Sequence, residues 1–272
     1  MDQRGKSIKE NVIAIIPARY ASVRLPGKML REIAGKPLIL HTLEQAMKAR
    51  SVNRVIVATD DQRIFAVVKG VGGEAVMTSN GHASGSDRIA EVARTLAAES
   101  LVVNVQGDEP LISPATIDLA VQAMVDDAGA DIVTTCTSLT ELYGELLNGN
   151  VVKVVVGDDG YALYFSRSPI PFPRDASLRH GGGPDRAIEA EPELMANFRR
   201  HTGLYVYRRE YLLRFAGLPQ TTLERIESLE QLRALEDRAR IRVVDVDTPS
   251  MGVDTESDLA RVAGLMDSGV PV

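Results

Sequence analysis

Short apolar runs alternate with helical patterns along the first half of the chain, and this alternation restricts the possible folds more than any other feature. The runs have the length and composition of buried strands and lie at 12–18, 54–60, 74–79, 101–108 and 131–139. Segments with apolar residues at helical spacing separate them, at 37–50, 61–70, 86–98 and 114–128. This order predicts an α/β fold, with a mixed, mainly parallel Rossmann-like sheet and helices on both faces.

The pattern changes after about residue 149. The segment VVKVVVGDDGYALYFSRS (151–168) predicts a hairpin with its turn at 158–160, which makes it a smaller inserted antiparallel lobe. Residues 174–196 contain HGGGPD and scattered charges, so we expect a flexible loop there. A strand, a long helix, a strand and a closing helix are predicted to follow, at 201–209, 222–239, 241–248 and 256–266.

These patterns predict three parts of the chain. The first is a disordered N-terminal arm of polar residues, 1–11. The second is an α/β domain made of 12–149 and 240–272, and the third is a smaller lobe, 150–239. A sheet domain interrupted by a smaller lobe is a common way to build a cleft that holds one ligand on each side.

Composition excludes several classes of protein. The net charge of −6 argues against a general nucleic-acid binder, which needs a net basic face. No apolar run approaches the ~20 residues of a membrane helix, and the polar start MDQRGKSIKEN lacks the apolar core of a signal peptide. The single cysteine, Cys136, forbids an internal disulfide and lies in an apolar run where burial is expected. We therefore expect a cytoplasmic protein with no membrane contact.

A basic loop follows the first apolar strand. Arg19, Arg24 and Lys28 lie within ten residues where VIAIIPA ends, at the edge of the sheet where open α/β folds bind ligands. Three cations on such a loop predict a site for a small polyanion, and a solvated basic turn is the alternative. The loop is not a Walker A motif, because Ser22 and Met29 stand where that motif needs a glycine and a serine or threonine.

Two aspartates are candidate Mg²⁺ ligands. Asp108 ends the apolar strand 101–108, where a carboxylate can hold this hard cation beside nucleotide phosphates. The alternative is that Asp108 caps the following turn. Asp254 follows Gly252-Val253 and precedes the closing helix, so capping of that helix is an equally good interpretation.

Three further residues are candidates for ligand contacts. Arg88 lies at a helix start, SGSDRIAEV, where Ser84 and Gly85 can present a hydroxyl and backbone amides to a base or an anion; a plain capped helix is the alternative. Arg167 ends a strand of the smaller lobe, so its guanidinium could bind a substrate carboxylate. His201 opens the strand HTGLYVY and is the best candidate of the four histidines.

Six segments in this order resemble the CMP-Kdo synthetase family, the 3-deoxy-manno-octulosonate cytidylyltransferases. They are ARYASVRLPGK, NVQGDEP, YALYFSR, HTGLYVYRR, LEQLR and GVDTESDL. The resemblance runs from about Val12 to Met266. It implies a nucleotidyltransferase fold and a Mg²⁺-dependent reaction that joins CTP to Kdo, giving CMP-Kdo and pyrophosphate for lipopolysaccharide biosynthesis. It also implies a homodimer formed through the smaller lobe, which would be the sugar-binding and dimerisation lobe.

The resemblance also implies a role for each matching residue. Arg19, Ser22, Arg24 and Lys28 match positions on the CTP triphosphate, while Ser84, Gly85 and Arg88 match positions near the cytidine. Asp108 and Asp254 match the magnesium-binding aspartates, and with Lys28 they form the expected catalytic set. The positions that hold Kdo are matched by Gln106, Arg167, His201, Tyr205, Glu230 and Gln231.

Some alternatives remain open at this level. The segment SGSDR stands where SGTER is commoner, and 174–196 is longer and richer in glycine than is usual in the family. Another ulosonate, such as sialic acid or 8-amino-Kdo, could replace Kdo, and a catalytically silent nucleotide-binding protein is a second alternative. No covalent nucleophile with a supporting base is evident, so we expect direct in-line displacement.

Overall fold

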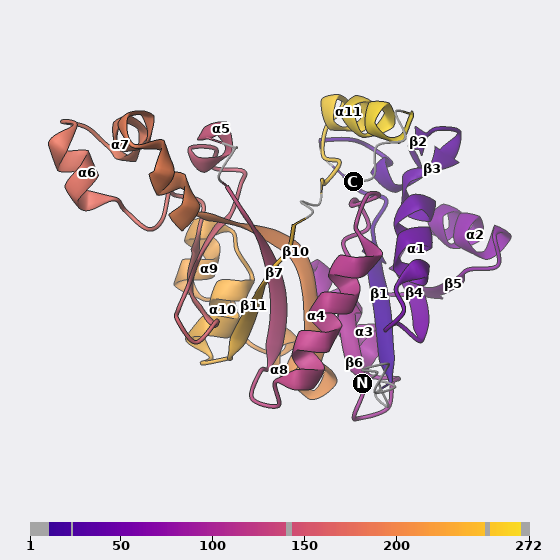
Figure 1. Cartoon of the computed structure of the whole chain (residues 1–272). Coiled ribbons are helices and arrows are strands. Elements are labelled where there is room, and N and C mark those ends of the chain that lie inside the picture. The colour runs from indigo at the N-terminus through magenta and orange to yellow at the C-terminus, as the bar shows by residue number, and fades with distance from the viewer. Residues whose placement is uncertain (1–10, 23, 140–142, 248–250, 268–272) are drawn as a thin grey trace, which may run out of the picture. The chain divides into compact units, whose positions relative to one another are not determined.

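The computed structural model describes residues 11–22, 24–139, 143–247 and 251–267 (Figure 1). Two compact units divide the chain. The first comprises Met1–Ala128, Leu204–Gly217 and Ser250–Val272, and the second comprises Gly129–Gly203 and Leu218–Pro249. These boundaries differ from the predicted ones in two places. Strand β7 (Ile132–Ser138) pairs with β11 (Ile241–Asp245), which places 129–149 and 240–249 with the second unit. The end of strand β10 (Arg199–Arg208) pairs with β6 (Leu101–Asn104), which places 204–217 with the first unit rather than with the predicted lobe.

A mainly parallel sheet forms the centre of the first unit. Its strand order is β10-β6-β1-β4-β5. The neighbouring strands β6, β1, β4 and β5 are parallel, and the last part of β10 pairs antiparallel with β6. The strands are β1 (Val12–Ala18), β4 (Arg54–Thr59), β5 (Glu74–Met77), β6 (Leu101–Asn104) and β10 (Arg199–Arg208). The predicted mixed, mainly parallel sheet is thus confirmed.

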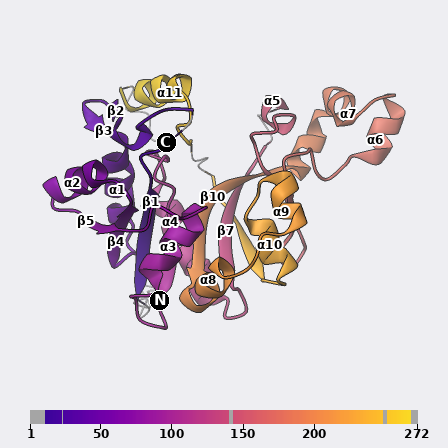
Figure 2. The ribbon, with the colours of Figure 1, turned by 180° about the vertical axis from the view of Figure 1, so that it is seen from behind.

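Helices cover both faces of this sheet. Figure 1 shows α1 and α4 on the near face, and Figure 2, from behind, shows α3 on the other. The helices are α1 (Leu38–Lys48), α2 (Gln62–Gly70), α3 (Gly85–Ala93), α4 (Pro114–Asp126), α8 (Arg209–Ala216) and α11 (Glu256–Asp267). A short 3-10 helix, η1 (Lys28–Leu30), and the two-residue strands β2 (Glu32–Ile33) and β3 (Lys36–Pro37) follow β1.

The sequence explains why the parallel strands are apolar throughout. All residues of β1 except Pro17 are buried, as are all four residues of β6, because helices pack on both faces. The polar residues that follow these strands therefore lie at the carboxyl edge of the sheet. The candidate site lies at this edge of the sheet.

The second unit contains a different set of strands. Strand β7 (Ile132–Ser138) pairs in parallel with β11 (Ile241–Asp245). The predicted hairpin is present as β8 (Lys153–Val156) and β9 (Ala162–Ser166), which pair antiparallel, and β8 also pairs with the start of β10. The antiparallel hairpin predicted from 151–168 is therefore confirmed.

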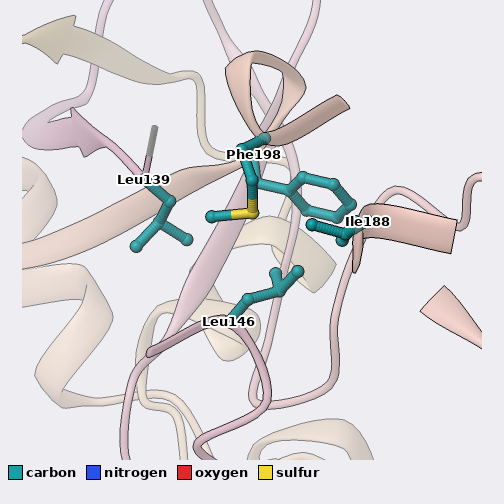
Figure 3. Close-up of a cluster of buried hydrophobic side chains, with 5 residues drawn as sticks. Leu139, Leu146, Ile188 and Phe198 are labelled. Carbon is teal, nitrogen blue, oxygen red and sulfur yellow. The ribbon is translucent and has the colours of Figure 1, made fainter. Parts of the chain in front are cut away.

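The interpretation of 174–196 as a flexible loop was wrong. The segment folds into α6 (Arg174–Arg179), α7 (Pro184–Ala190) and the 3-10 helix η2 (Pro192–Asn197). Figure 3 shows the reason: Ile188 of α7 and Phe198 lie against Leu139 and Leu146, the last residue of α5 (Tyr143–Leu146), and Met195 completes this buried cluster. The apolar residues of this segment, interspersed among glycines and charges, thus form a small core together with Leu139 and Leu146.

The long helix predicted at 222–239 is two helices, α9 (Thr222–Glu227) and α10 (Gln231–Glu236). Ser228 breaks it with a left-handed backbone, φ 52° and ψ 49°. Helical spacing continues across the break, so the pattern of apolar residues did not show it. The break places Glu227 and Glu230 on opposite sides of a tight turn.

The predicted N-terminal arm, 1–11, lies outside the described residues except for Asn11. The carbonyl of Asn11 accepts a hydrogen bond from the amide of Leu101 at 3.0 Å, and its side chain donates to Ser100 at 3.2 Å. Throughout the described part of the chain, we find no helix that is both long enough and apolar enough to cross a bilayer.

Candidate active site

Lys28 joins the two candidate aspartates at the carboxyl edge of the first unit's sheet. Its Nζ lies 2.5 Å from Oδ2 of Asp108 and 2.9 Å from Oδ1 of Asp254. The three residues are brought together from positions that span 226 residues of sequence. All three residues of the expected catalytic set therefore meet at one point.

Close packing of the backbone holds Lys28 and Asp108 in place. Gly27 has a left-handed φ of 65° and precedes η1, where Lys28 itself is only 7% exposed. Gly107 lies so close to β1 that a Cβ there would stand 2.9 Å from the carbonyl oxygen of Pro17. A glycine before Asp108 thus lets the strand end approach the loop that carries Lys28.

Asp254 does not cap the closing helix. The hydroxyl of Thr255 accepts a hydrogen bond from the amide of Asp258 at 3.2 Å, and the carboxylate of Asp258 accepts from the amide of Asp254 at 3.2 Å. The carboxylate of Asp254 instead faces Lys28 and also pairs with Arg24 at 2.9 Å. The amide of Val253 donates to the carbonyl of Asp108 at 2.9 Å, which fixes the two aspartates side by side.

The electrostatics of this centre favour a charged lysine. Burial alone lowers the pKa of Lys28, but the charges and hydrogen bonds of Asp108 and Asp254 together raise that pKa above its usual value. The centre therefore holds one ammonium and two carboxylates, with Arg24 at its exposed side. Two hard oxygen donors on one point suit Mg²⁺, which typically takes one or two carboxylates and completes its shell with phosphates and water.

In the residues that the structure describes, no group of three or more His, Cys, Asp or Glu side chains could hold a metal by itself.

The rest of the basic loop is more open. Arg19 and Arg24 are exposed and Ser22 is half-buried, so their side chains are accessible to an anion. Tyr20 lies between them in sequence, and its ring stacks under the guanidinium of Arg63, 3.4 Å from ring centroid to Cζ. The phenol also covers Gly27, where a Cβ would stand 3.2 Å from its oxygen. Tyr20 therefore braces the loop against the start of α2.

At the start of α3 the structure shows a capping box. The hydroxyl of Ser84 accepts from the amide of Asp87 at 3.1 Å, and the carboxylate of Asp87 accepts from the amide of Ser84 at 3.2 Å. Gly85 lies against β1, and a Cβ there would stand 3.6 Å from Cγ of Pro17. The helix start is thus packed onto the sheet edge beside the basic loop.

Arg88 is buried, at 4% exposure, and its guanidinium has protein partners. It donates to Asp60 at 2.7 Å, to the hydroxyl of Thr78, and to the carbonyl of Ser79 at 3.3 Å. The guanidinium therefore fixes the segment that follows β5. A role of Arg88 near a nucleotide base remains a prediction. Because its guanidinium is bonded to protein groups, a base would meet the backbone of 78–85 rather than a free guanidinium.

The residues expected to hold the sugar acid are divided between the two units. Gln106 and Tyr205 belong to the first. The side-chain amide of Gln106 donates to Asn104 at 3.0 Å, and the ring of Tyr205 stacks on Tyr207 at 5.8 Å between centroids. Tyr205 of β10 pairs with Asn104 of β6, and Gln106 lies two residues after Asn104. The two residues therefore lie on or next to neighbouring strands.

In the second unit, His201 is held by packing. Its Nε2 lies 2.9 Å from the hydroxyl of Thr134, and its ring meets the edge of Phe165 at 5.1 Å between centroids. Desolvation lowers the pKa of His201 to about 3, so its imidazole is neutral at pH 7. A neutral ring beside a hydroxyl can orient a sugar hydroxyl, but it is a poor cation for a carboxylate.

The remaining three residues of the set surround the turn between α9 and α10. Glu230 is half-buried and precedes α10, while Gln231 is 7% exposed and begins it. The guanidinium of Arg167 donates to main-chain carbonyls on both sides, at Gly149 and Glu227. Arg167 is therefore oriented by the backbone.

Sequence reasoning missed several residues that support these groups. The carboxylate of Asp60 accepts a hydrogen bond from Arg88. Asp60 stands at the end of the apolar strand RVIVATD, which is the same signal that singled out Asp108. Tyr20 and Glu227 carried no such signal, since an aromatic in a basic loop and an acid on an amphipathic helix are both common.

Comparison with known proteins identifies the family. The family model described as "Cytidylyltransferase" matches residues 13–241. A 3-deoxy-manno-octulosonate cytidylyltransferase of Trichlorobacter lovleyi is 50% identical over 262 residues, which cover 95% of this chain and 99% of that protein. A protein of the same name from Geobacter sulfurreducens is 50% identical over 256 residues, covering 93% of this chain and 98% of its own length.

A solved structure agrees with this result. CMP:2-keto-3-deoxy-manno-octonic acid synthetase complexed with CTP aligns with a TM-score of 0.85 at 40% identity, covering 96% of this chain and all of that one. A cytidylyltransferase from Leptospira borgpetersenii is 14% identical with a TM-score of 0.61, which shows a shared fold.

Proposed function

The chain belongs to the cytidylyltransferase family, among the 3-deoxy-manno-octulosonate cytidylyltransferases, and on this premise we propose that Lys28, Asp108 and Asp254 form the centre where it joins CTP to Kdo. The products are CMP-Kdo and pyrophosphate. The observation that carries the assignment of the centre is the convergence of both carboxylates on the one ammonium, 2.5 and 2.9 Å away.

The reaction is an in-line displacement at phosphorus. The anomeric oxygen of Kdo forms a bond to the α-phosphorus of CTP, the bond from that phosphorus to the bridging oxygen breaks, and pyrophosphate leaves with the bonding electrons. Water or a neighbouring base accepts the proton of the attacking hydroxyl. Because the enzyme forms no covalent bond, its work is positioning and neutralisation of charge.

The basic loop supplies the positive charge. Arg19, Ser22 and Arg24 are accessible for the triphosphate, and Lys28 is charged at neutral pH, with a pKa raised by its two aspartates. On phosphate binding, Lys28 exchanges part of its contact with the carboxylates for phosphate oxygens. The ammonium then offsets the charge that develops on the departing pyrophosphate.

Asp108 and Asp254 fit a magnesium site. Their facing oxygens are the ligand type that Mg²⁺ prefers, and they already lie around one cationic point. When bound, Mg²⁺ would lower the pKa of the attacking hydroxyl and neutralise charge on the α-phosphate. The two aspartates would hold the ion, and the hydrogen bond from the amide of Val253 to the carbonyl of Asp108 keeps their spacing.

The nucleotide base and the sugar acid are assigned from the family positions. The segment with Ser84, Gly85 and Arg88 would lie near the cytidine. The Kdo set comprises Gln106, Arg167, His201, Tyr205, Glu230 and Gln231. The neutral imidazole of His201 supports contact with a hydroxyl, while the remaining N–H groups of Arg167 supply the charge for the sugar carboxylate.

We further propose a cytoplasmic homodimer that serves lipopolysaccharide biosynthesis. The second unit carries exposed apolar side chains at Leu163, Phe172 and Ile226, which are 58–74% exposed and suit a subunit interface. Light scattering tests this assembly: a mass of one chain in dilute solution would contradict it.

Pyrophosphate release tests the activity. Purified protein is given Mg²⁺, CTP and Kdo, beside reactions with sialic acid or 8-amino-Kdo, with UTP, and with EDTA. Release that needs CTP, Kdo and metal together supports the proposal. Release with another ulosonate keeps the mechanism and changes the substrate, whereas no release with any pair favours a silent nucleotide-binding protein.

A further inference from the structure

Glu227, which no sequence signal selected, is the centre of a hydrogen-bond network in the second unit. It is the last residue of α9. One carboxylate oxygen accepts from the hydroxyl of Ser166 at 2.6 Å, and the other accepts from the amide of Arg167 at 2.9 Å. The side chain of Glu227 therefore binds the end of strand β9.

The side chain of Arg167 in turn donates hydrogen bonds to main-chain carbonyls of Glu227 and its surroundings. Its Nε donates to the carbonyl of Glu227 at 2.6 Å, its Nη2 to the carbonyl of Ser228 at 3.3 Å, and its Nη1 to the carbonyl of Gly149 at 2.9 Å. Three of its five N–H groups thus point at main-chain oxygens, and among the residues that the structure describes each terminal nitrogen keeps one more hydrogen to donate. The guanidinium plane is fixed, with part of its capacity left for a ligand.

The same network fixes the turn before α10. Ser228 has a left-handed backbone, and the amide of Leu229 donates to the carbonyl of Glu224 at 3.2 Å. Two residues later the chain reaches Glu230 and Gln231. Any movement of Glu227 relative to β9 must therefore move Arg167 and these two side chains together.

A buried lysine supports the network from behind. Lys153 has no exposed surface, and its Nζ donates to the carbonyls of Arg167, of Val151 at 2.7 Å and of Asn148 at 3.1 Å. Charged groups that are this well bonded are costly to displace. Lys153 thus immobilises the backbone of Arg167, to which the carboxylate of Glu227 is hydrogen-bonded.

We propose that Glu227 is a positioning residue for recognition of the sugar acid: it aligns the guanidinium of Arg167 with Glu230 and Gln231. This proposal rests on the proposed function, because that function assigns those three residues to Kdo. The carboxylate of Glu227 accepts hydrogen bonds from the hydroxyl of Ser166 and the amide of Arg167, so it acts on the sugar acid through its neighbours. The prediction is a selective effect on the sugar substrate.

The test compares Glu227→Ala with Glu227→Gln. Glutamine keeps an oxygen that can accept from the amide of Arg167, and its NH₂ can donate to the hydroxyl of Ser166. Alanine leaves both donors without that partner, so the guanidinium of Arg167 loses its alignment and the affinity for the sugar acid should fall roughly tenfold. Ser166→Ala is a milder second variant in case Glu227→Ala does not fold. The control is Glu236→Ala, which changes an exposed acid of the same unit.

Two readouts are measured for each variant: the KM values for Kdo and CTP, and hydrogen exchange of the amides of 228–232. We expect Glu227→Ala to raise KM for Kdo about tenfold with KM for CTP within about twofold, and to speed exchange at 228–232. Ser166→Ala should move both readouts in the same direction by less. Glu227→Gln and Glu236→Ala should resemble the wild type.

Several results would overturn the proposal. Equal rises in both KM values would indicate a general structural role, and faster exchange with unchanged KM for Kdo would remove the link to the sugar. Failure of the wild type to use Kdo is a different result, since it would contradict the proposed function. The exchange experiment would then still decide whether Glu227 orders the turn, because unchanged exchange in Glu227→Ala excludes it.

Discussion

The ammonium of Lys28 lies 2.5 Å from a carboxylate oxygen of Asp108, and it takes its place there from a loop 80 residues earlier in the sequence. The pair brings the end of strand β6 and the loop after β1 to one point at the sheet edge. In the proposed reaction, the lysine belongs with the triphosphate and the aspartate with the metal. Their contact therefore keeps two groups of opposite charge in register before substrates bind.

Asp108→Asn tests the role of this carboxylate. Asparagine preserves shape but removes the charge that would hold Mg²⁺, so we expect kcat to fall by roughly 10²–10³ or more. The fold should persist, because Asn can still accept from Lys28. The measurements are kcat and the thermal midpoint, with Asp158→Asn on the exposed hairpin turn as the control. Turnover like that of the wild type would remove Asp108 from the mechanism.

Arg88 and Asp60 should be energetically coupled. Their side chains are only 5% and 19% exposed and lie 2.7 Å apart, so loss of either leaves a largely buried charge without its partner. We expect Arg88→Ala to lower the free energy of unfolding by ~2–4 kcal/mol, and the double variant with Asp60→Asn to lose less than the sum of the single changes.

Urea unfolding of the four proteins gives this coupling energy. Lys36→Ala is a control, since Lys36 pairs with Glu44 on the surface and its removal should hardly change the midpoint. If the two single changes simply add, the pair does not interact in the folded protein.

Gly27→Ala should disturb the basic loop. A Cβ at this position meets a left-handed φ of 65° and would stand 3.2 Å from the phenol oxygen of Tyr20. The strain alone costs ~1–2 kcal/mol, and its relief would move Lys28. We expect KM for CTP to rise several-fold. Gly35→Ala is the matched control, because Gly35 has a φ of 73° with no atom within 4 Å of the added Cβ.

The two glycine variants separate strain from crowding. Gly35→Ala should lower stability by a similar amount and leave KM for CTP unchanged. Similar KM values for CTP in both variants would mean that the position of the loop does not matter for nucleotide binding.

His201 should make the protein sensitive to acid. Its pKa is lowered from about 6.5 to about 3 by burial, so the unfolded chain binds a proton below pH 6.5 that the folded chain does not. Stability from this group is therefore complete above pH 6.5 and is lost as the pH falls toward 3. Between pH 7 and 5, the loss attributable to His201 should be up to about 2 kcal/mol.

His201→Gln isolates this contribution. Glutamine can still bond the hydroxyl of Thr134 but does not titrate, so its unfolding free energy should fall less between pH 7 and 5 than that of the wild type. Carboxylates titrate in both proteins and cancel in the comparison. Parallel pH profiles would show that folding does not lower the pKa of the imidazole.

The sequence predicted the first unit well because strand periodicity and helix spacing there are local signals. Lys28 and Asp108 were recognisable for the same reason: each lies in the segment that follows an apolar strand, whose end must lie at the sheet edge. The role of Asp254 could not be decided from the local sequence, because whether an acid caps a helix depends on its neighbours. Here Thr255 caps the helix instead.

The second unit was harder to predict for physical reasons. The break at Ser228 depends on a left-handed backbone that serine seldom adopts, and contacts with β9 hold it. The role of Glu227 likewise depends on contacts with residues 60 positions away. Patterns within a helix carry no information on such partners.

Ile188→Ala tests whether 174–197 is an ordered part of the second unit. Ile188 is 2% exposed and packs with Leu139, Leu146 and Phe198 in the cluster of Figure 3, so its truncation leaves a cavity. We expect the free energy of unfolding to fall by ~2–4 kcal/mol and exchange at the amides of α7 to rise. Leu178→Ala is the control, because Leu178 of α6 is 66% exposed and should cost little. A flexible loop would make the two variants equally stable, so equal midpoints in urea would contradict the packed arrangement.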